Sequence, residues 1–165
     1  MEIWDGYFRD GTPANIDLVR DRPIPEGLYH LVCDVLVRHR DGDFLLMQRD
    51  YAKPNYGGKY EATAGGSALK GESELECAKR ELLEETGLCA ESLEEFGRYI
   101  SKDTIYVSYL GTVDCDKASV TLQPGETISY KWISESAFKA FIHSGEMIPT
   151  QRVRFENYFK KCGYI

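Results

Sequence analysis

One stretch, Gly66 to Leu88, constrains the fold and the chemistry of this chain more than any other, and it reads GSALKGESELECAKRELLEETGL. Ser73 and Glu76 have the spacing of a capping box, in which each side chain bonds the other residue's backbone N–H, so a helix is expected to begin near Ser73. Gly87 supplies the left-handed residue with which many helices end. The stretch therefore predicts a loop followed by a single short helix.

Acidic side chains gather on one side of that helix. At about 100° per residue, one sector holds Glu74, Cys77, Glu81, Glu84 and Glu85. The neighbouring sector is apolar and is expected to be the packed one: Leu75, Ala78, Leu82 and Leu83. Arg80 precedes Glu84 by four residues, near enough to pair with it and to hold its rotamer. Carboxylates this close repel each other, but they are the ligands that Mg2+ prefers, and Mg2+ also binds phosphate oxygens. The alternative is a solvated acidic helix face.

The spacing favours the metal-binding interpretation. The pattern G-x5-E-x7-R-E-(aliphatic)-x-E-E-x-G-(aliphatic) is met at every specified position, and it resembles the Nudix box, the signature of Nudix hydrolases. The resemblance implies an α/β fold of the Nudix type, an α/β/α sandwich with a mixed central sheet. It also implies a Mg2+- or Mn2+-dependent attack of water on a diphosphate that is linked to another moiety.

The same resemblance implies roles for individual residues. The metal ligands would be Glu81, Glu84, Glu85 and the backbone carbonyl of Gly65. Glu72 would anchor the junction between loop and helix, and Arg80 would orient the acidic side chains. A box glutamate, Glu84, or else Glu126 would deprotonate the attacking water. Glu126 is included because many Nudix enzymes have a Gly-Glu pair before a Trp-containing strand, although a strand-edge acid is the alternative.

Each candidate site residue outside the box also has a structural explanation. Asp103 lies between two predicted strands and is typical of a turn residue. Arg152 and Arg154 on the last predicted helix can reach a phosphate, but exposed helical arginines usually have no such role. Three tyrosines can stack a base or bind a sugar, or simply pack in the core and loops: Tyr51, Tyr56 and Tyr60. His30 and His39 are expected to have structural or surface roles rather than catalytic ones, since neither belongs to the box. The sequence identifies no substrate-binding residue.

The first 27 residues exceed what a minimal catalytic domain needs. Residues 1–20 predict a hairpin and residues 20–27 an extended connector. This segment resembles the branch of the superfamily that contains isopentenyl diphosphate isomerase and its hydrolase-like relatives. Those isomerases carry a catalytic Cys and, two residues on, a His, where this chain has Gly65 and Ser67, so isomerase activity is not expected. A non-catalytic metabolite-sensing module is a second alternative, but such modules usually show losses in the acidic box.

Alternating and helical patterns predict the remaining elements. The Val- and Leu-rich residues 29–39 predict a central strand, and Asp41-Gly42 is a two-residue hairpin signal that returns the chain as a partner strand, residues 44–49. Residues 60–64 predict a short strand before the box. After the box, three more strands are expected at residues 93–100, 104–113 and 126–133. Two helices follow, from Ser134 to Gly145 and from Pro149 to Gly163, within a single domain of residues 1–165.

The resemblance implies a small-molecule diphosphate as the partner, and composition disfavours two other classes of partner, nucleic acids and membranes. The formal net charge of −7 disfavours generic nucleic-acid binding and anionic membrane surfaces. No apolar run approaches about 18 residues, so no membrane span is expected. The N-terminus lacks the basic and apolar regions of a signal peptide. Five cysteines without a C-x-x-C pair suggest reduced thiols, which fits a cytoplasmic location. The sequence leaves open whether the chain forms a homodimer.

Overall fold

The computed structural model describes all of residues 1–165. Two strands form a separate hairpin, β1 (Ile3–Tyr7) and β2 (Pro13–Val19). The other seven strands form one sheet: β3 (His30–His39), β4 (Phe44–Arg49), β5 (Tyr60–Glu61), β6 (Thr63–Ser67), β7 (Ser92–Ser101), β8 (Thr104–Val113) and β9 (Thr127–Ile133). The helices are α1 (Glu74–Thr86), α2 (Glu135–His143) and α3 (Pro149–Lys161), with a 3-10 turn at Lys117–Ser119. None of them is both long and apolar enough to cross a membrane.

Strand β3 is central, as its composition predicts. It runs parallel to β8 along its whole length, from His30 opposite Thr104 to His39 opposite Val113, and antiparallel to β6. The sheet is therefore mixed. The prediction that β4 returns as the partner of β3 is only partly right, because the two strands pair at one position and β4 then diverges to pair with β9 and β5. Strand β6 takes the place beside β3 instead.

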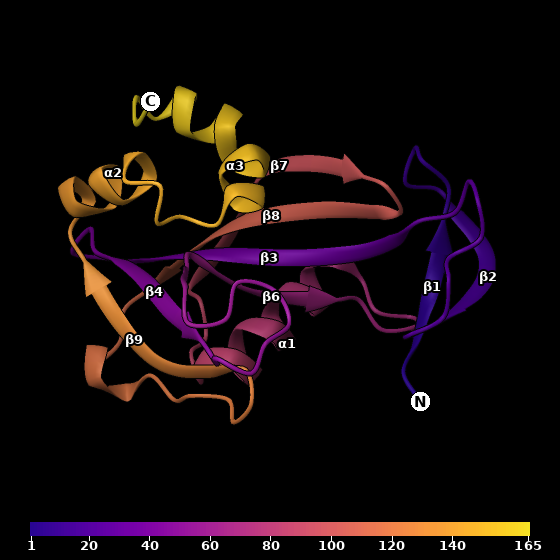
Figure 1. The fold of residues 1–165 in the computed structure, drawn as a ribbon, viewed down its shortest axis with the longest axis horizontal. Coiled ribbons are helices and arrows are strands. Elements are labelled where there is room, and N and C mark those ends of the chain that lie inside the picture. The colour runs from indigo at the N-terminus through magenta and orange to yellow at the C-terminus, as the bar shows by residue number, and fades with distance from the viewer.

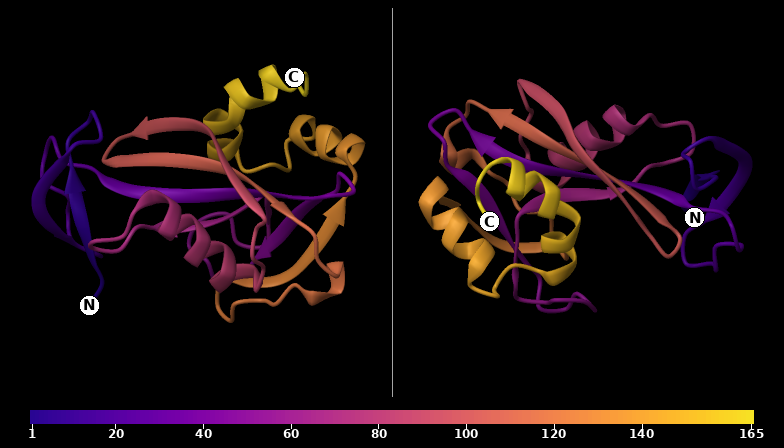
Figure 2. Two further views of the ribbon diagram at one scale, coloured as in Figure 1. Left: turned by 180° about the vertical axis from the view of Figure 1, so that it is seen from behind. Right: turned by 90° about the horizontal axis from the view of Figure 1, so that it is seen from above.

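Helices cover both faces of the sheet (Figures 1 and 2). On one face, alternate β3 side chains such as Cys33 and Val35 pack with α1 residues, among them Leu82. On the other face, Leu36 packs with the aromatic side chains of α2 and α3, which include Phe138, Phe155 and Phe159. This period-two alternation is what a strand buried between two helical layers requires. The predicted α/β/α sandwich is confirmed.

The packed side of α1 differs from the predicted one. Leu75 and Leu83 are 42% and 51% exposed, whereas the buried residues are Cys77, Ala78, Leu82 and Thr86. The prediction is right for Ala78 and Leu82 and wrong for Leu75 and Leu83, because it separated the packed sector from the acidic one. The side of α1 that meets the sheet lies between them and includes Glu81, whose side chain is only 12% exposed. Leu83, at the outer edge of the predicted sector, consequently faces solvent.

The N-terminal hairpin forms as predicted and lies at one end of the sheet (Figure 1). Trp4 and Leu18 pack there with Leu28 in a small hydrophobic cluster of their own. The hairpin is tied to the loop before α1, because Ile3 O accepts from Lys70 N–H at 2.9 Å and the Asp5 carboxylate accepts from Gly71 N–H at 2.7 Å. It therefore stands beside the Nudix-like stretch.

Candidate active site

Both ends of α1 are fixed by local sequence. Ser73 Oγ accepts from Glu76 N–H at 3.3 Å, and the Glu76 carboxylate accepts from Ser73 N–H at 2.8 Å, so the predicted capping box is present. Gly87 adopts φ 72° and donates its N–H to Leu83 O at 2.8 Å, which confirms the predicted left-handed helix end. These two caps fix where α1 begins and ends, and they thereby fix the position of its glutamates along β6.

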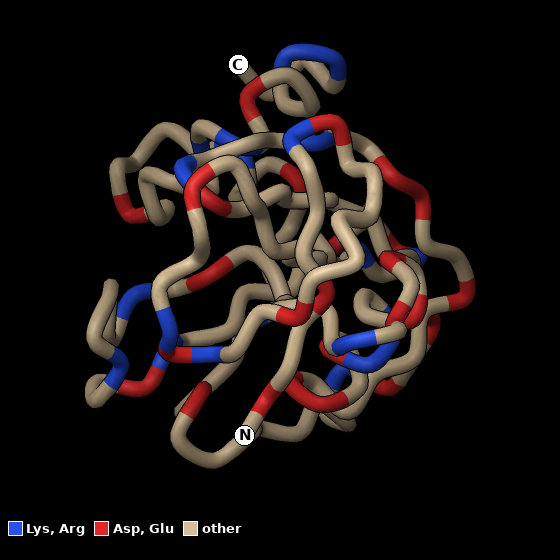
Figure 3. Tube along the Cα trace, turned by 90° about the vertical axis from the view of Figure 1, so that its right-hand side faces the viewer, with Lys and Arg blue, Asp and Glu red and all other residues tan.

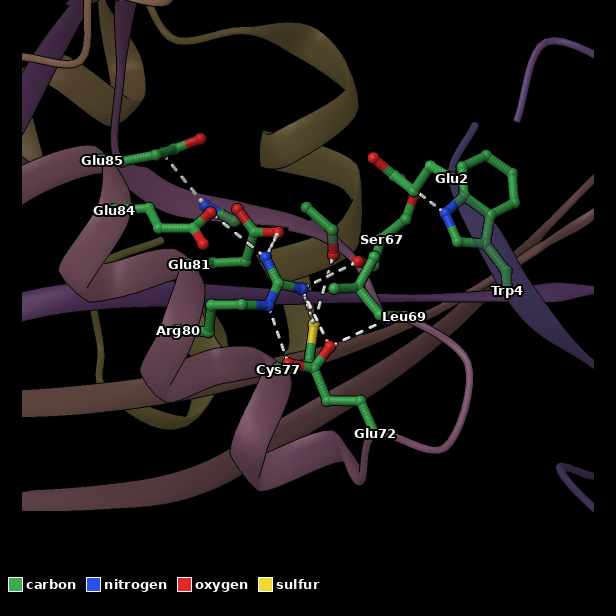
Figure 4. Close-up of polar contacts among 12 residues, drawn as sticks. Glu2, Trp4, Ser67, Leu69, Glu72, Cys77, Arg80, Glu81, Glu84 and Glu85 are labelled. Atoms are coloured by element: carbon green, nitrogen blue, oxygen red, sulfur yellow. Dashed lines mark hydrogen bonds and ion pairs between the residues drawn. The ribbon is translucent and has the colours of Figure 1, made fainter. Parts of the chain in front are cut away.

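Arg80 is the centre of an ion-pair cluster at the base of the site (Figure 4). Its guanidinium donates two bonds to the Glu72 carboxylate, at 2.7 and 2.8 Å, in the fork geometry that arginine favours. Its Nη1 donates to Glu81 at 2.6 Å and to Glu84 at 3.2 Å. Glu72 also accepts from Leu69 N–H at 2.9 Å, so it holds the loop against the helix. These partners raise the pKa of Arg80, the Glu72 hydrogen bonds being the largest cause.

Glu85 is an enclosed carboxylate without a cationic partner. Its only hydrogen bond comes from Gly65 N–H at 3.2 Å, and no lysine or arginine forms an ion pair with it. Burial raises its pKa well above the ordinary value, and the nearby carboxylates of Glu61, Glu81 and Glu126 raise it further. A carboxylate in such surroundings is stabilised by a cation placed among these acids.

The glycines before α1 make room for these acids. A Cβ on Gly66 would lie 2.5 Å from Glu81 Oε1, and a Cβ on Gly65 would lie 2.5 Å from the Cys33 carbonyl oxygen of β3. Only glycine therefore lets β6 approach both β3 and the Glu81 carboxylate. The structure accounts for the glycine pair in steric terms.

A cavity of about 460 Å3 opens over this cluster. Helix α1 contributes Arg80 and the three glutamates Glu81, Glu84 and Glu85. Lys53 and Glu126 also line the cavity and form an ion pair with each other. The N-terminal segment supplies another wall, made of Glu2, Trp4, Arg20 and Asp21. The structure thus places Gly65, Arg80, the three box glutamates and Glu126 around one cavity, and the sequence predicts all of them as site residues. Their individual roles stay predictions.

Other nominated residues lie away from this cavity. Arg154 binds the buried Asp34 at 3.0 Å and lies over the Tyr106 ring on the opposite face of the sheet, so it supports the core. Asp103 accepts from the Thr104 hydroxyl at the β7–β8 turn. None of the remaining candidates lines the cavity, namely Arg152, Tyr51, Tyr56 and Tyr60. His30 stacks on Trp4 with ring centroids 4.6 Å apart, and His39 packs against Trp132, both of which are structural contacts.

Several residues around the site carry no recognisable sequence signal. Glu61 lies among the acids near Glu85 and is held by Arg49 at 2.7 Å and by Gln151 Nε2 at 3.2 Å. Burial raises the pKa of Glu61, and Arg49 partly opposes this effect. Gln151, a polar residue in the first turn of α3, is buried and reaches Glu61 from there. The long sequence separations explain why no motif reveals these contacts. Lys53 sits in a polar loop that the sequence alone does not connect to the box.

The side chains present fit a hard divalent cation. The candidate metal ligands are all oxygen atoms, from the α1 glutamates and the Gly65 carbonyl. The enclosed Glu85 carboxylate among them lacks a positively charged partner. In this structure Glu81 and Glu84 bind Arg80, and no three acidic, histidine or cysteine side chains converge in a ligating arrangement. The donor chemistry therefore suits Mg2+ or Mn2+, and the glutamates would have to turn from Arg80 toward the ion.

Comparison with known proteins identifies the class. Residues 28–151 match the sequence model of the NUDIX domain. An uncharacterised Nudix hydrolase of Listeria innocua is 27% identical over 152 residues, covering 90% of this chain and 89% of the relative. The crystal structure of DR0079 from Deinococcus radiodurans superposes with a TM-score of 0.68 at 17% identity, covering 87% of this chain and 90% of that one. A MutT protein of Methanosarcina mazei Go1 superposes with a TM-score of 0.63 at 27% identity, covering 87% and 98%.

The chain therefore belongs to the Nudix family. Its place there makes it a hydrolase of the class that acts on pyrophosphate bonds.

Replacing Gly66 by Ala tests the close approach of β6 to α1. The added Cβ would displace the Glu81 carboxylate, the mobile end of a side chain, so we expect a folded protein that has lost at least about tenfold in turnover. Gly97→Ala is the matched control, because a Cβ there meets nothing within 4 Å. Turnover and melting temperature of the two purified variants should be compared. Wild-type turnover in Gly66→Ala would contradict the steric argument.

Proposed function

We propose that this chain is a Mg2+- or Mn2+-dependent hydrolase that cleaves a diphosphate linkage, in a nucleoside diphosphate joined to another moiety or in a small organic diphosphate. One observation carries the proposal: Glu81, Glu84, Glu85 and Glu126 line the same cavity, and the most enclosed of them, Glu85, has no cationic partner. A bound divalent cation and an anionic substrate complement that charge pattern.

The metal ligands in this proposal are Glu81, Glu84, Glu85 and the carbonyl of Gly65. When bound, a divalent metal neutralises charge on the diphosphate oxygens and polarises the attacked phosphorus. Arg80 holds Glu81 and Glu84 through ion pairs in the present arrangement, in which Glu72 anchors Arg80, and it would release the two glutamates to the metal. Glu84 or Glu126 accepts the proton of the attacking water. Lys53 pairs with Glu126 and holds that carboxylate in the cavity lining.

A panel assay tests the proposal. Purified protein is incubated with nucleotide sugars, dinucleoside polyphosphates, dinucleotides of the NAD type, nucleoside triphosphates and prenyl diphosphates, and products are identified by mass spectrometry. We expect metal-dependent hydrolysis of at least one diphosphate, abolished by a chelator. If folded protein with Mg2+ or Mn2+ cleaves no member of the panel, the proposal is wrong.

The isomerase alternative finds no support in the cavity. No cysteine lines it, since Cys33 and Cys77 are buried in the core, and Gly65 and Ser67 stand where the isomerase thiol and imidazole would be. We therefore predict no conversion of isopentenyl to dimethylallyl diphosphate. A chromatographic assay with a metal-only control measures this. Formation of the isomer at enzyme-like rates would contradict the prediction.

A further inference from the structure

We propose that the hairpin of β1 and β2 selects the substrate, with Glu2 and Arg20 binding a hydroxyl-rich group, a sugar, that is joined to the diphosphate. The inference rests on the proposed function for the diphosphate chemistry. It assigns a role to a part of the chain that lies outside residues 28–151, the range that matches the family. Figure 4 shows Glu2 and Trp4 beside the loop of Ser67 and Leu69, on the other side of it from the α1 glutamates.

The cavity wall is polar, which argues against an apolar substrate group. Only two of its 15 lining residues are hydrophobic, Trp4 and Leu69. Trp4 is 8% exposed, and its ring is already stacked on His30. A prenyl chain would find little apolar surface to bury here, and a flat base would find no exposed aromatic ring in the cavity lining. A group that carries several hydroxyls suits such a wall.

Glu2 and Arg20 form an oriented pair of an acceptor and a donor. The residues flank the hairpin ends, where Arg20 N–H donates to Glu2 O at 3.1 Å. Glu2 Oε2 accepts from Arg20 Nη1 at 3.0 Å, and Glu2 Oε1 accepts from the Trp4 indole N–H at 2.7 Å. Each carboxylate oxygen keeps further acceptor capacity, and the guanidinium keeps free N–H donors, with 58% of the Arg20 side chain exposed.

This arrangement matches the chemistry of neighbouring hydroxyl groups. Each hydroxyl both donates and accepts a hydrogen bond, so a carboxylate and a guanidinium side by side can satisfy a pair of them. A carboxylate serves this purpose for ribose hydroxyls in dinucleotide-binding folds. The indole N–H and Arg20 hold Glu2 in one orientation before the substrate arrives, which reduces the entropy lost on binding.

The position of the pair relative to the α1 acids is also fixed. Lys70, in the loop that leads into α1, holds the hairpin by two hydrogen bonds. Its backbone N–H donates to Ile3 O at 2.9 Å, and its side-chain ammonium donates to the Asp17 carboxylate at 2.6 Å. Glu2 is the main cause of the raised pKa of Arg20, and Glu126 across the cavity contributes, so Arg20 faces the same space. A diphosphate over α1 would thus extend its attached group toward Glu2 and Arg20.

Steady-state kinetics of the full chain tests the inference. The probes are UDP-glucose and ADP-ribose, which carry sugars, and dimethylallyl diphosphate, which does not, each with Mg2+. We expect wild type to prefer a sugar-bearing probe by at least about tenfold in kcat/KM. Glu2→Gln and Arg20→Met should raise KM for that probe about tenfold with kcat little changed, the pattern of lost ground-state binding. Arg9→Met is the matched control, because Arg9 lies in the hairpin but outside the cavity.

The outcomes separate this inference from the proposed function. Preference for dimethylallyl diphosphate, or an unchanged KM in both folded variants, overturns the inference and leaves the hydrolase proposal standing. If a variant does not fold, the wild-type preference still decides. If no probe is hydrolysed, the hydrolase proposal fails for these compounds, and calorimetric titration with ADP-ribose decides: binding that Arg20→Met abolishes supports the inference, and no binding by wild type overturns it.

Discussion

Glu85→Gln and Glu84→Gln are each expected to lower kcat by at least about a hundredfold on any substrate that the wild type hydrolyses. Both side chains line the cavity beside Glu81 and are proposed metal ligands. Gln keeps the size of the side chain but removes the negative charge, which weakens the hold on a divalent cation and, at Glu84, removes a candidate base. Turnover at saturating substrate and metal, with circular dichroism to confirm the fold, measures the effect.

Glu74→Gln is the matched control for these variants. Glu74 belongs to the same acidic sector in sequence, but it binds Arg98 at 2.6 Å on the outer surface and does not line the cavity. Its replacement should leave kcat within about twofold of wild type, since surface substitutions away from a site change little. Near-wild-type turnover in both Glu84→Gln and Glu85→Gln would remove the α1 glutamates from the mechanism. A large loss in Glu74→Gln would show instead that negative charge anywhere on α1 matters.

Local rules explain how much of the site is predictable from sequence. The limits of α1 follow from Ser73, Glu76 and Gly87, because capping depends on residues within one turn of the helix end. The Arg80–Glu84 ion pair follows from four-residue spacing on a helix. The alternation in β3 likewise predicts its central place between two helical layers. These features need no knowledge of distant contacts.

Contacts over long sequence separations account for what the sequence does not reveal. Strand β4 pairs with β3 at one position only and otherwise with β9 and β5, while the glycine-containing β6 pairs with β3 over five positions. The local charge of a site also depends on which residues the fold brings together. Basic and acidic residues are interspersed along the chain (Figure 3), so the net charge of the sequence does not indicate the charge of any one cavity. Lys53 and Glu126 meet only because the fold brings two loops together, and the hairpin wall arises in the same way.

Mg2+ or Mn2+ is expected to raise the melting temperature of the wild-type protein without any substrate. Glu81 and Glu85 are largely enclosed, and their mutual repulsion and loss of hydration weigh against the folded state. An ion that binds only the folded form at ten times its dissociation constant stabilises it by about 1.4 kcal/mol. For a chain of this size the shift is about 3–5 °C. Differential scanning fluorimetry with and without the ion measures it.

Glu85→Gln distinguishes specific binding from a general salt effect. Without metal this variant should melt at the same temperature as wild type or higher, because Gln removes an enclosed charge that no lysine or arginine compensates. It should also lose most of the metal-induced rise, whereas Glu74→Gln, whose carboxylate lies outside the cavity, should keep it. Na+ at matched ionic strength should not reproduce the rise. A full metal-induced shift in Glu85→Gln, or none in wild type at millimolar metal, would mean that the cation does not bind among these glutamates.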